Sequence, residues 1–182
     1  MTVPVPASLP RLGDRVILRR LSPADLPAFQ AYRTDPAVGR YQGWRPQPEA
    51  EALAFIEEMA AVPLFPEGTW VQIGIAERRS NLLIGDIGMC VAAGGAAAEI
   101  GFSLSPLAQG HGLGTEAVQE AVRFLFQQTA VADVVGITDA RNAPSVRLLE
   151  RVGMRRVASR SSVFRGEPCI EHTYAISRPH GG

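Results

Sequence analysis

The spacing of apolar residues changes in the first half of the chain, and this change limits the folds that the chain can adopt. Over residues 52–59, apolar side chains recur at i, i+3, i+4 and i+7, which is typical of a helix with one buried face. Residues 70–76, 82–91 and 97–104 then form three strand-like runs, separated by short polar or glycine-rich connections. Three such runs in succession predict an antiparallel meander.

Capping signals place several of the remaining elements. Ser22-Pro-Ala-Asp25 resembles a capping box with proline at the first helical position, and this helix should end before Asp35-Pro36. Gly153 is a suitable C-terminal cap for a helix that starts at Asn142. Because a strand–helix–strand segment follows the meander, we expect an α+β fold with a mixed, largely antiparallel sheet of about seven strands and four helices. The expected strands are 15–21, 70–76, 82–91, 97–104, 134–138, 157–164 and 170–176, and the expected helices are 22–34, 48–60, 115–128 and 142–152.

The chain length fits a single domain with short tails. With 182 residues, 46% of them hydrophobic, the chain is long enough to bury a core but short for two domains. We expect one domain over residues 13–177, a flexible proline-rich tail over 1–12 and a C-terminal tail over 178–182.

Charge and cysteine content exclude several classes of partner. The 18 basic residues balance 18 acidic residues, so we expect no nucleic-acid or membrane partner. Cys90 and Cys169 stand alone, and Cys169-x-x-His172 lacks further ligands, so we expect neither a disulfide framework nor a metal site. Residues 1–10 lack the pattern of a signal peptide, and a cytoplasmic location follows as the expectation.

A glycine-rich loop carries the clearest chemical signal. Residues 109–117 read Gln-Gly-His-Gly-Leu-Gly-Thr-Glu-Ala and lie between a predicted strand and a predicted helix. The first turn of a helix offers unpaired backbone N–H groups, and glycines let an anion approach them closely, so this loop is typical of a phosphate site. A P-loop would require Lys after Gly114, and a dinucleotide fingerprint would require Gly in place of Thr115. The loop fits neither nucleotide motif.

The loop does match Q-x-x-G-x-G through Gln109, Gly112 and Gly114, and here the sequence resembles the GNAT superfamily of acetyltransferases. Further segments resemble its RimJ/RimL branch, the ribosomal-protein N-terminal acetyltransferases, in the same order and spacing. The resemblance covers about residues 13–176 and is carried by segments 33–36, 83–88, 98–106, 110–117, 142–145 and 149–154.

The resemblance implies a GNAT sheet splayed around acetyl-CoA, with the pyrophosphate on the glycine loop and the pantetheine beside the strand 99–104. Thr115 would add a hydroxyl to a phosphate or merely cap the helix, and the side chain of His111 would point to solvent more readily than to the cofactor. The implied cofactor-binding residues are Phe102, Leu104, Gln109, Gly110, His111, Gly112, Leu113, Gly114, Thr115, Asn142 and Ser145.

The implied reaction is direct attack of an amine on the thioester. Many GNAT members protonate the departing thiolate with a Tyr, but Leu149 occupies that position here, so Ser145 is the substitute candidate. Asn142 and Ser145 have an alternative interpretation as helix caps. Strand alternation places Glu99 and Ser103 on one face, and Glu99 is the candidate general base, with a purely structural role as its alternative.

The acceptor is less closely defined. In the branch that the chain resembles, the acceptor groove implies Tyr41, Trp44 and Phe164 as substrate-binding residues, although aromatic packing is an equal alternative. A protein N-terminus is the first candidate, and an aminoglycoside, a polyamine or an amino acid is the second. A non-catalytic acyl-CoA sensor is a third reading. The resemblance also favours a homodimer.

Overall fold

The computed structural model describes residues 8–179, which form an eight-stranded sheet in the order β1-β2-β3-β4-β5-β6-β8-β7. Every neighbouring pair is antiparallel except β5 and β6, which are parallel. The strands are β1 (Arg11–Leu12), β2 (Val16–Arg19), β3 (Trp70–Glu77), β4 (Leu83–Val91), β5 (Ala97–Leu104), β6 (Asp133–Asp139), β7 (Arg155–Phe164) and β8 (Glu167–Ser177).

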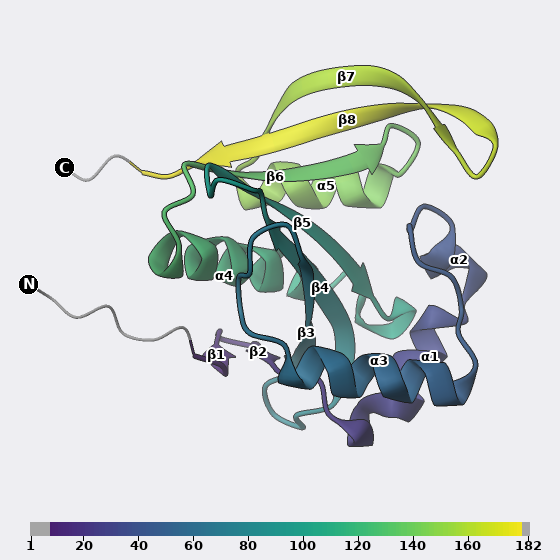
Figure 1. Cartoon of the computed structure of the whole chain (residues 1–182). Helices are drawn as coiled ribbons and strands as arrows, with labels where there is room; N and C mark the ends of the chain where they lie inside the picture. Colours follow the sequence, from purple (N-terminus) through teal and green to yellow (C-terminus); the bar gives the residue numbers. More distant parts are fainter. Residues whose placement is uncertain (1–7, 180–182) are drawn as a thin grey trace, which may run out of the picture.

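Helices cover the sheet and form two hydrophobic cores. The larger core joins the sheet to α4 and α5, and the smaller core lies under α1 and α3. Figure 1 shows the β7–β8 hairpin passing α5, with its tip on the side of α2. The helices are η1 (Pro23–Asp25), α1 (Leu26–Arg33), α2 (Pro36–Gly39), α3 (Glu49–Ala61), η2 (Pro106–Ala108), α4 (Leu113–Gln128) and α5 (Ala143–Val152).

The parallel pair opens into a wedge. β5 and β6 pair only from Ala97 opposite Asp133 to Ile100 opposite Gly136. Beyond that point β5 continues beside β4, and β6 continues beside β8. The two strands therefore separate toward their C-terminal ends, where α4 and α5 begin.

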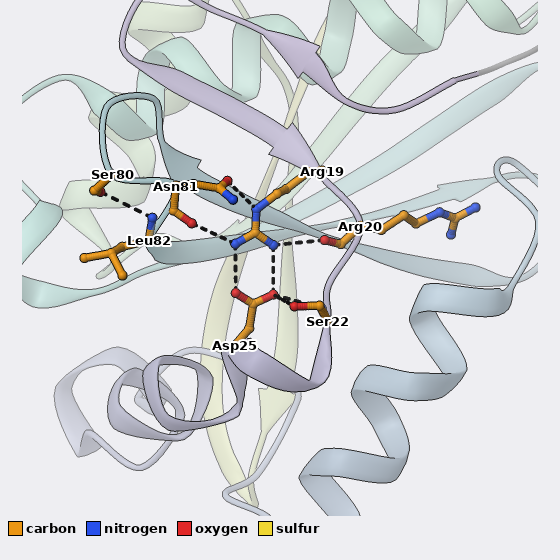
Figure 2. Close-up of polar contacts among 7 residues, drawn as sticks. All are labelled: Arg19, Arg20, Ser22, Asp25, Ser80, Asn81 and Leu82. Atoms are coloured by element: carbon orange, nitrogen blue, oxygen red, sulfur yellow. Dashed lines mark hydrogen bonds and ion pairs between the residues drawn. The ribbon is translucent and has the colours of Figure 1, made fainter.

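Arg19 fastens the start of the helical region to the β3–β4 turn (Figure 2). Its guanidinium donates two hydrogen bonds of 2.8 Å to the Asp25 carboxylate, one of 2.8 Å to the Asn81 side chain and one of 3.0 Å to the Asn81 carbonyl. Asp25 also accepts the Ser22 backbone N–H at 2.8 Å, which matches the capping box read from the sequence. This cluster has its polar partners within itself, so its role is to hold two turns together.

The α+β fold class and the mixed sheet are confirmed, with three short additional elements, β1, α2 and η2. The prediction of about seven strands omitted β1, which is only two residues long and lies inside the expected tail over residues 1–12. Arg11 pairs with Glu120 at 2.9 Å, so this part of the expected tail contacts α4. The prediction of four helices omitted α2, because Asp35-Pro36 ends α1 and also starts a new helix: the Asp35 carboxylate accepts the Ala37 N–H.

The C-terminal end of the described chain also differs from the expected tail. Arg178 donates hydrogen bonds to the carbonyls of Phe126, Thr129 and Val131, and so it contacts the loop after α4. Residues 1–7 and 180–182, which belong to the predicted tails, lie outside the described residues. The sheet runs from Arg11 to Ser177, and the domain limits of 13–177 stay a prediction.

Candidate active site

A cleft of about 810 Å³ lies at the open end of the β5–β6 wedge. Its walls come from four segments of the chain: residues 37–42, 102–104, 108–115 and 141–151. The cleft thus joins the glycine loop, the end of β5 and the start of α5, which the sequence analysis predicted to act together.

The glycine loop presents free backbone amides at the N-terminus of α4. Gly110 and Gly112 have φ values of 79° and 77°, a left-handed conformation that favours glycine. Within residues 8–179, the backbone amides from Gly110 to Thr115 donate no hydrogen bond to another residue, whereas the Glu116 amide bonds to the Gly112 carbonyl. These amides, together with the positive end of the helix dipole, form a site suited to the pyrophosphate of a cosubstrate.

Arg15, on the other side of the loop, holds it in place. Its guanidinium donates to the His111 carbonyl at 2.8 Å and to the Glu116 carboxylate at 3.0 Å. Burial alone would raise the pKa of Glu116, but hydrogen bonds from Arg15 and Val16 outweigh it and lower that pKa. The side chain of His111 is exposed and is not part of the cleft wall, which agrees with a solvent-facing side chain, and its implied role in cofactor binding stays a prediction.

Phe102 and Leu104 line the cleft and turn their backbone groups toward it. The Ser105 N–H donates to the Ile84 carbonyl on the β4 side. Because backbone groups alternate in direction along a strand, the N–H and C=O groups of the even-numbered residues of β5 point toward the wedge. Two glutamine side chains reach these carbonyls: Gln109 Nε2 donates to Leu104 O at 2.9 Å, and Gln42 Nε2 donates to Phe102 O at 3.0 Å. Gln109 was expected at the cofactor, whereas no local pattern marked Gln42.

Asn142 and Ser145 both line the cleft at the start of α5. The Asn142 side chain accepts the Ser145 N–H at 3.4 Å, so the capping interpretation is realised in the structure. The Ser145 hydroxyl forms no hydrogen bond with the described residues. Leu149 is 1% exposed and packs into the larger core, so it contributes no polar group to the cleft.

Glu99 lies outside the cleft wall. It is half-buried on β5, before the strands separate, and is paired in register with Cys90. Burial raises the pKa of Glu99, and the nearby Glu171 raises it further, against the opposing effect of Arg160. The structure therefore does not place Glu99 beside Ser145, and its role as a base stays a prediction.

The three expected acceptor residues occupy different positions. Tyr41 lines the cleft, whereas Trp44 borders a neighbouring cavity of about 430 Å³ and Phe164 borders neither. At the tip of the β7–β8 hairpin, Arg165 donates to the carbonyls of Gln42 and Trp44, each at 3.0 Å. The hairpin tip therefore contacts the segment after α2 across the rim of the cleft.

A buried ion pair supports this rim from below. Arg33 binds Asp86 through contacts of 3.0 to 3.3 Å, and Asp86 also accepts from Tyr32 at 2.5 Å and from Gln72 at 2.6 Å. Asp86 is fully buried, and burial together with this carboxylate raises the pKa of Tyr32 well above its ordinary value. The Arg33 guanidinium also lies 4.5 Å from the centre of the Trp44 ring.

Sequence reasoning missed the arginines of the cleft. Arg40, Arg141, Arg147 and Arg151 all line it. Arg147 and Arg151 are four residues apart on α5, a helical spacing that would have placed both on one face. Arg151 Nε lies 3.4 Å from the hydroxyl of Thr115, which brings this helix next to the glycine loop.

No helix within residues 8–179 combines the length and apolar character needed to cross a bilayer. In the same part of the chain, no cluster of three or more His, Cys, Asp or Glu residues is arranged to hold a metal ion.

Known proteins share both the sequence pattern and the fold. Residues 15–155, well over half of the chain, match the acetyltransferase (GNAT) domain family. The uncharacterised N-acetyltransferase YoaA of Bacillus subtilis (strain 168) is 29% identical over 170 residues, which cover 91% of this chain and 95% of YoaA. A GNAT-family acetyltransferase from Bacillus anthracis superposes with a TM-score of 0.83 at 22% identity, covering 93% of this chain and 98% of that one. RimL, the ribosomal L7/L12 alpha-N-protein acetyltransferase, in complex with coenzyme A, gives 0.78 at 16% identity and covers 92% and 96%.

The chain belongs to the GNAT acetyltransferase family. It is an acetyl-CoA-dependent N-acetyltransferase, which confirms the interpretation drawn from the glycine loop and its neighbouring segments. The two solved structures, at their low identities, establish the shared fold alone.

Proposed function

We propose that this enzyme acetylates the N-terminal α-amine of a protein or peptide. The observation that carries the proposal is that the described residues lining the cleft include no Asp and no Glu. A polyamine or an aminoglycoside brings several ammonium groups, and burying each of them without an acidic partner is costly. A peptide N-terminus brings only the amine that reacts. The resemblance to the RimJ/RimL branch supports the same acceptor.

We further propose that the cosubstrate pyrophosphate binds the amides of residues 110–115, with the pantetheine beside Phe102 and Leu104. The free amides and the left-handed glycines support this placement, because they leave donors uncovered and the approach open. Arg147 and Arg151 add positive charge to the cleft wall, and Arg151 lies beside Thr115 of the glycine loop.

Acetyl-CoA supplies the acetyl group as a thioester. The neutral amine attacks its carbonyl carbon, a C–N bond forms, the C–S bond breaks and the amine loses one proton. We assign Ser145 as the proton donor to the departing thiolate, because its hydroxyl lines the cleft and Leu149 has no proton to give. Glu99 on β5 is the candidate base; because it lies outside the cleft wall it would act through water, and its raised pKa makes it a better proton acceptor.

The test is thiol release from acetyl-CoA with four classes of amine: N-terminal peptides, polyamines, aminoglycosides and amino acids. We expect release with peptides, and mass spectrometry should place the acetyl group on the α-amine. The matched control is the same peptide with a formylated N-terminus, which should give none. Thiol release with polyamines or aminoglycosides alone would overturn the assigned acceptor. If none of the four classes of amine gives thiol release, a non-catalytic acyl-CoA sensor is favoured.

We also propose that the protein works in the cytoplasm as a homodimer. Cys90 and Cys169 are both free thiols, which supports a reducing compartment. Light scattering over a range of protein concentrations measures the assembly directly. A monomer at every concentration would contradict the dimer.

A further inference from the structure

The arginines that line the cleft fall into two groups by their place in the chain. Arg147 and Arg151 belong to α5, and Arg151 lies 3.4 Å from Thr115 in the glycine loop. Arg40 is the C-cap residue of α2 and its guanidinium lies 5.2 Å from the centre of the Tyr41 ring, whereas Arg141 follows β6. The first group, Arg147 and Arg151, adjoins the glycine loop through Arg151, and the second group, Arg40 and Arg141, includes the arginine beside Tyr41, an expected acceptor residue.

The second group has more positive than negative charge. Arg141 binds Asp139 through its Nε at 3.0 Å and its Nη2 at 2.7 Å. Hydrogen bonds from Arg141 hold the pKa of Asp139 low against its burial, and the charge of the nearby Arg40 lowers it further. One ionised carboxylate therefore serves two guanidinium groups.

Arg40 is available to a ligand. Its side chain is exposed, and its guanidinium lies 5.2 Å from the centre of the Tyr41 ring. Among the described residues it forms no ion pair of its own. Asp35, at the other end of α2, is engaged with the Ala37 amide as the helix cap. Arg40 thus places an uncompensated charge on the wall beside Tyr41.

We propose that the enzyme selects acceptors with a negative charge near the reacting amine, recognised by Arg40 with the support of Arg141. This inference rests on the proposed function, and it narrows the acceptor to N-terminal peptides with Asp or Glu at the second or third position. A guanidinium binds a carboxylate in a planar, two-point geometry, and it repels a lysine side chain at the same place. The same charge disfavours polycationic amines.

The test compares three peptides that differ only at position 2, which is Asp, Asn or Lys. For the unmodified enzyme we expect kcat/KM to fall about fivefold from Asp to Asn, the effect of a partly exposed ion pair, and further from Asn to Lys. In R40Q the ratio of Asp to Asn should approach one, whereas R40E should prefer the Lys peptide. The KM for acetyl-CoA should stay the same in both variants.

R147Q is the matched control, because Arg147 also lines the cleft but belongs to α5, the helix that contacts the glycine loop through Arg151. This variant should raise the KM for acetyl-CoA and keep the preference for the Asp peptide. Equal kcat/KM for the three peptides, or a preference that survives in R40Q, would overturn the selectivity and leave peptide acetylation standing. If no peptide is acetylated, the proposed acceptor and the selectivity both fail.

Discussion

The indole N–H of Trp44 donates a hydrogen bond to the hydroxyl of Ser103, 3.2 Å away. This bond ties the segment after α2 to the end of β5, at the edge of the cleft. Arg33 contacts the same tryptophan, because its guanidinium lies 4.5 Å from the centre of the Trp44 ring. Arg33 also binds Asp86, which is paired in register with Ser103. The acceptor side of the cleft is therefore anchored to the smaller core.

Replacing Trp44 with Phe should keep the ring on Arg33 and remove the hydrogen bond to Ser103. We expect the KM for a peptide acceptor to rise severalfold, with a loss of about 1 kcal/mol in the free energy of unfolding. Steady-state kinetics and urea unfolding measure the two effects. Trp70→Phe is the control, since Trp70 is 44% exposed on β3 and outside the cleft. A similar rise in KM in both variants would contradict a role for this bond.

Replacing Asp86 with Ala should destabilise the fold strongly, because it leaves Arg33 buried without its partner. We expect a loss of about 3–5 kcal/mol in the free energy of unfolding, measured by chemical denaturation. The comparison is Glu171→Ala, which removes the partner of Arg160 from a pair whose Arg side chain is 67% exposed. That variant should lose less than about 1 kcal/mol. Equal losses would show that burial of the first pair has no special effect.

Replacing Gly112 with Val should abolish acetyl-CoA binding. Gly112 has a φ of 77°, and a Cβ there would lie 3.2 Å from Arg15 Nη2, so a side chain both strains the loop and obstructs the free amides. Calorimetry should show at least a tenfold rise in Kd, equivalent to about 1.4 kcal/mol. Gly68→Val is the matched control: Gly68 has a φ of 71° and open space around it, and it lies outside the cleft. If this control loses acetyl-CoA to the same extent, backbone strain alone explains the result.

Replacing Ser145 with Ala, or Glu99 with Gln, should lower turnover while acetyl-CoA still binds. Ser145→Ala removes the proposed proton donor, and Glu99→Gln should also remove the rise of kcat with pH that the raised pKa of Glu99 predicts. Thiol release and calorimetry separate the two readouts. Unchanged turnover in either variant would refute the role of that residue and leave the cofactor site untouched.

Replacing Asp25 with Asn should weaken the fold at neutral pH but not in acid. Burial would raise the pKa of Asp25, but hydrogen bonds from Arg19 and Ser22 and the charge of Arg19 together lower it. A lowered pKa in the folded state means that this stabilisation is present above the ordinary value of 3.8 and is lost as the pH falls through the lowered value. Urea unfolding of both proteins at several pH values measures the difference. A gap of equal size at pH 7 and pH 3 would contradict this linkage.

Local patterns predicted the parts of the site that depend on a single element. The glycine loop and the Asn142 cap could be read from the sequence, because a helix N-terminus needs particular residues at fixed neighbouring positions. Gln42 and Arg40 could not, because they reach the cleft only when the segment after α2 packs against β5, some sixty residues further along the chain. Glu99 illustrates the converse: strand alternation assigns it to one face of β5, but alternation does not say where β5 and β6 separate.

The side chains of Gln42 and Gln109 have a consequence beyond cofactor binding. A sheet that separates in its middle exposes a strand edge, and an exposed edge is a template on which a second chain can add a strand and start aggregation. Here the carbonyls of Phe102 and Leu104 already accept hydrogen bonds from the two glutamines. A foreign strand would have to displace both, so the opening between β5 and β6 is protected against edge-to-edge aggregation.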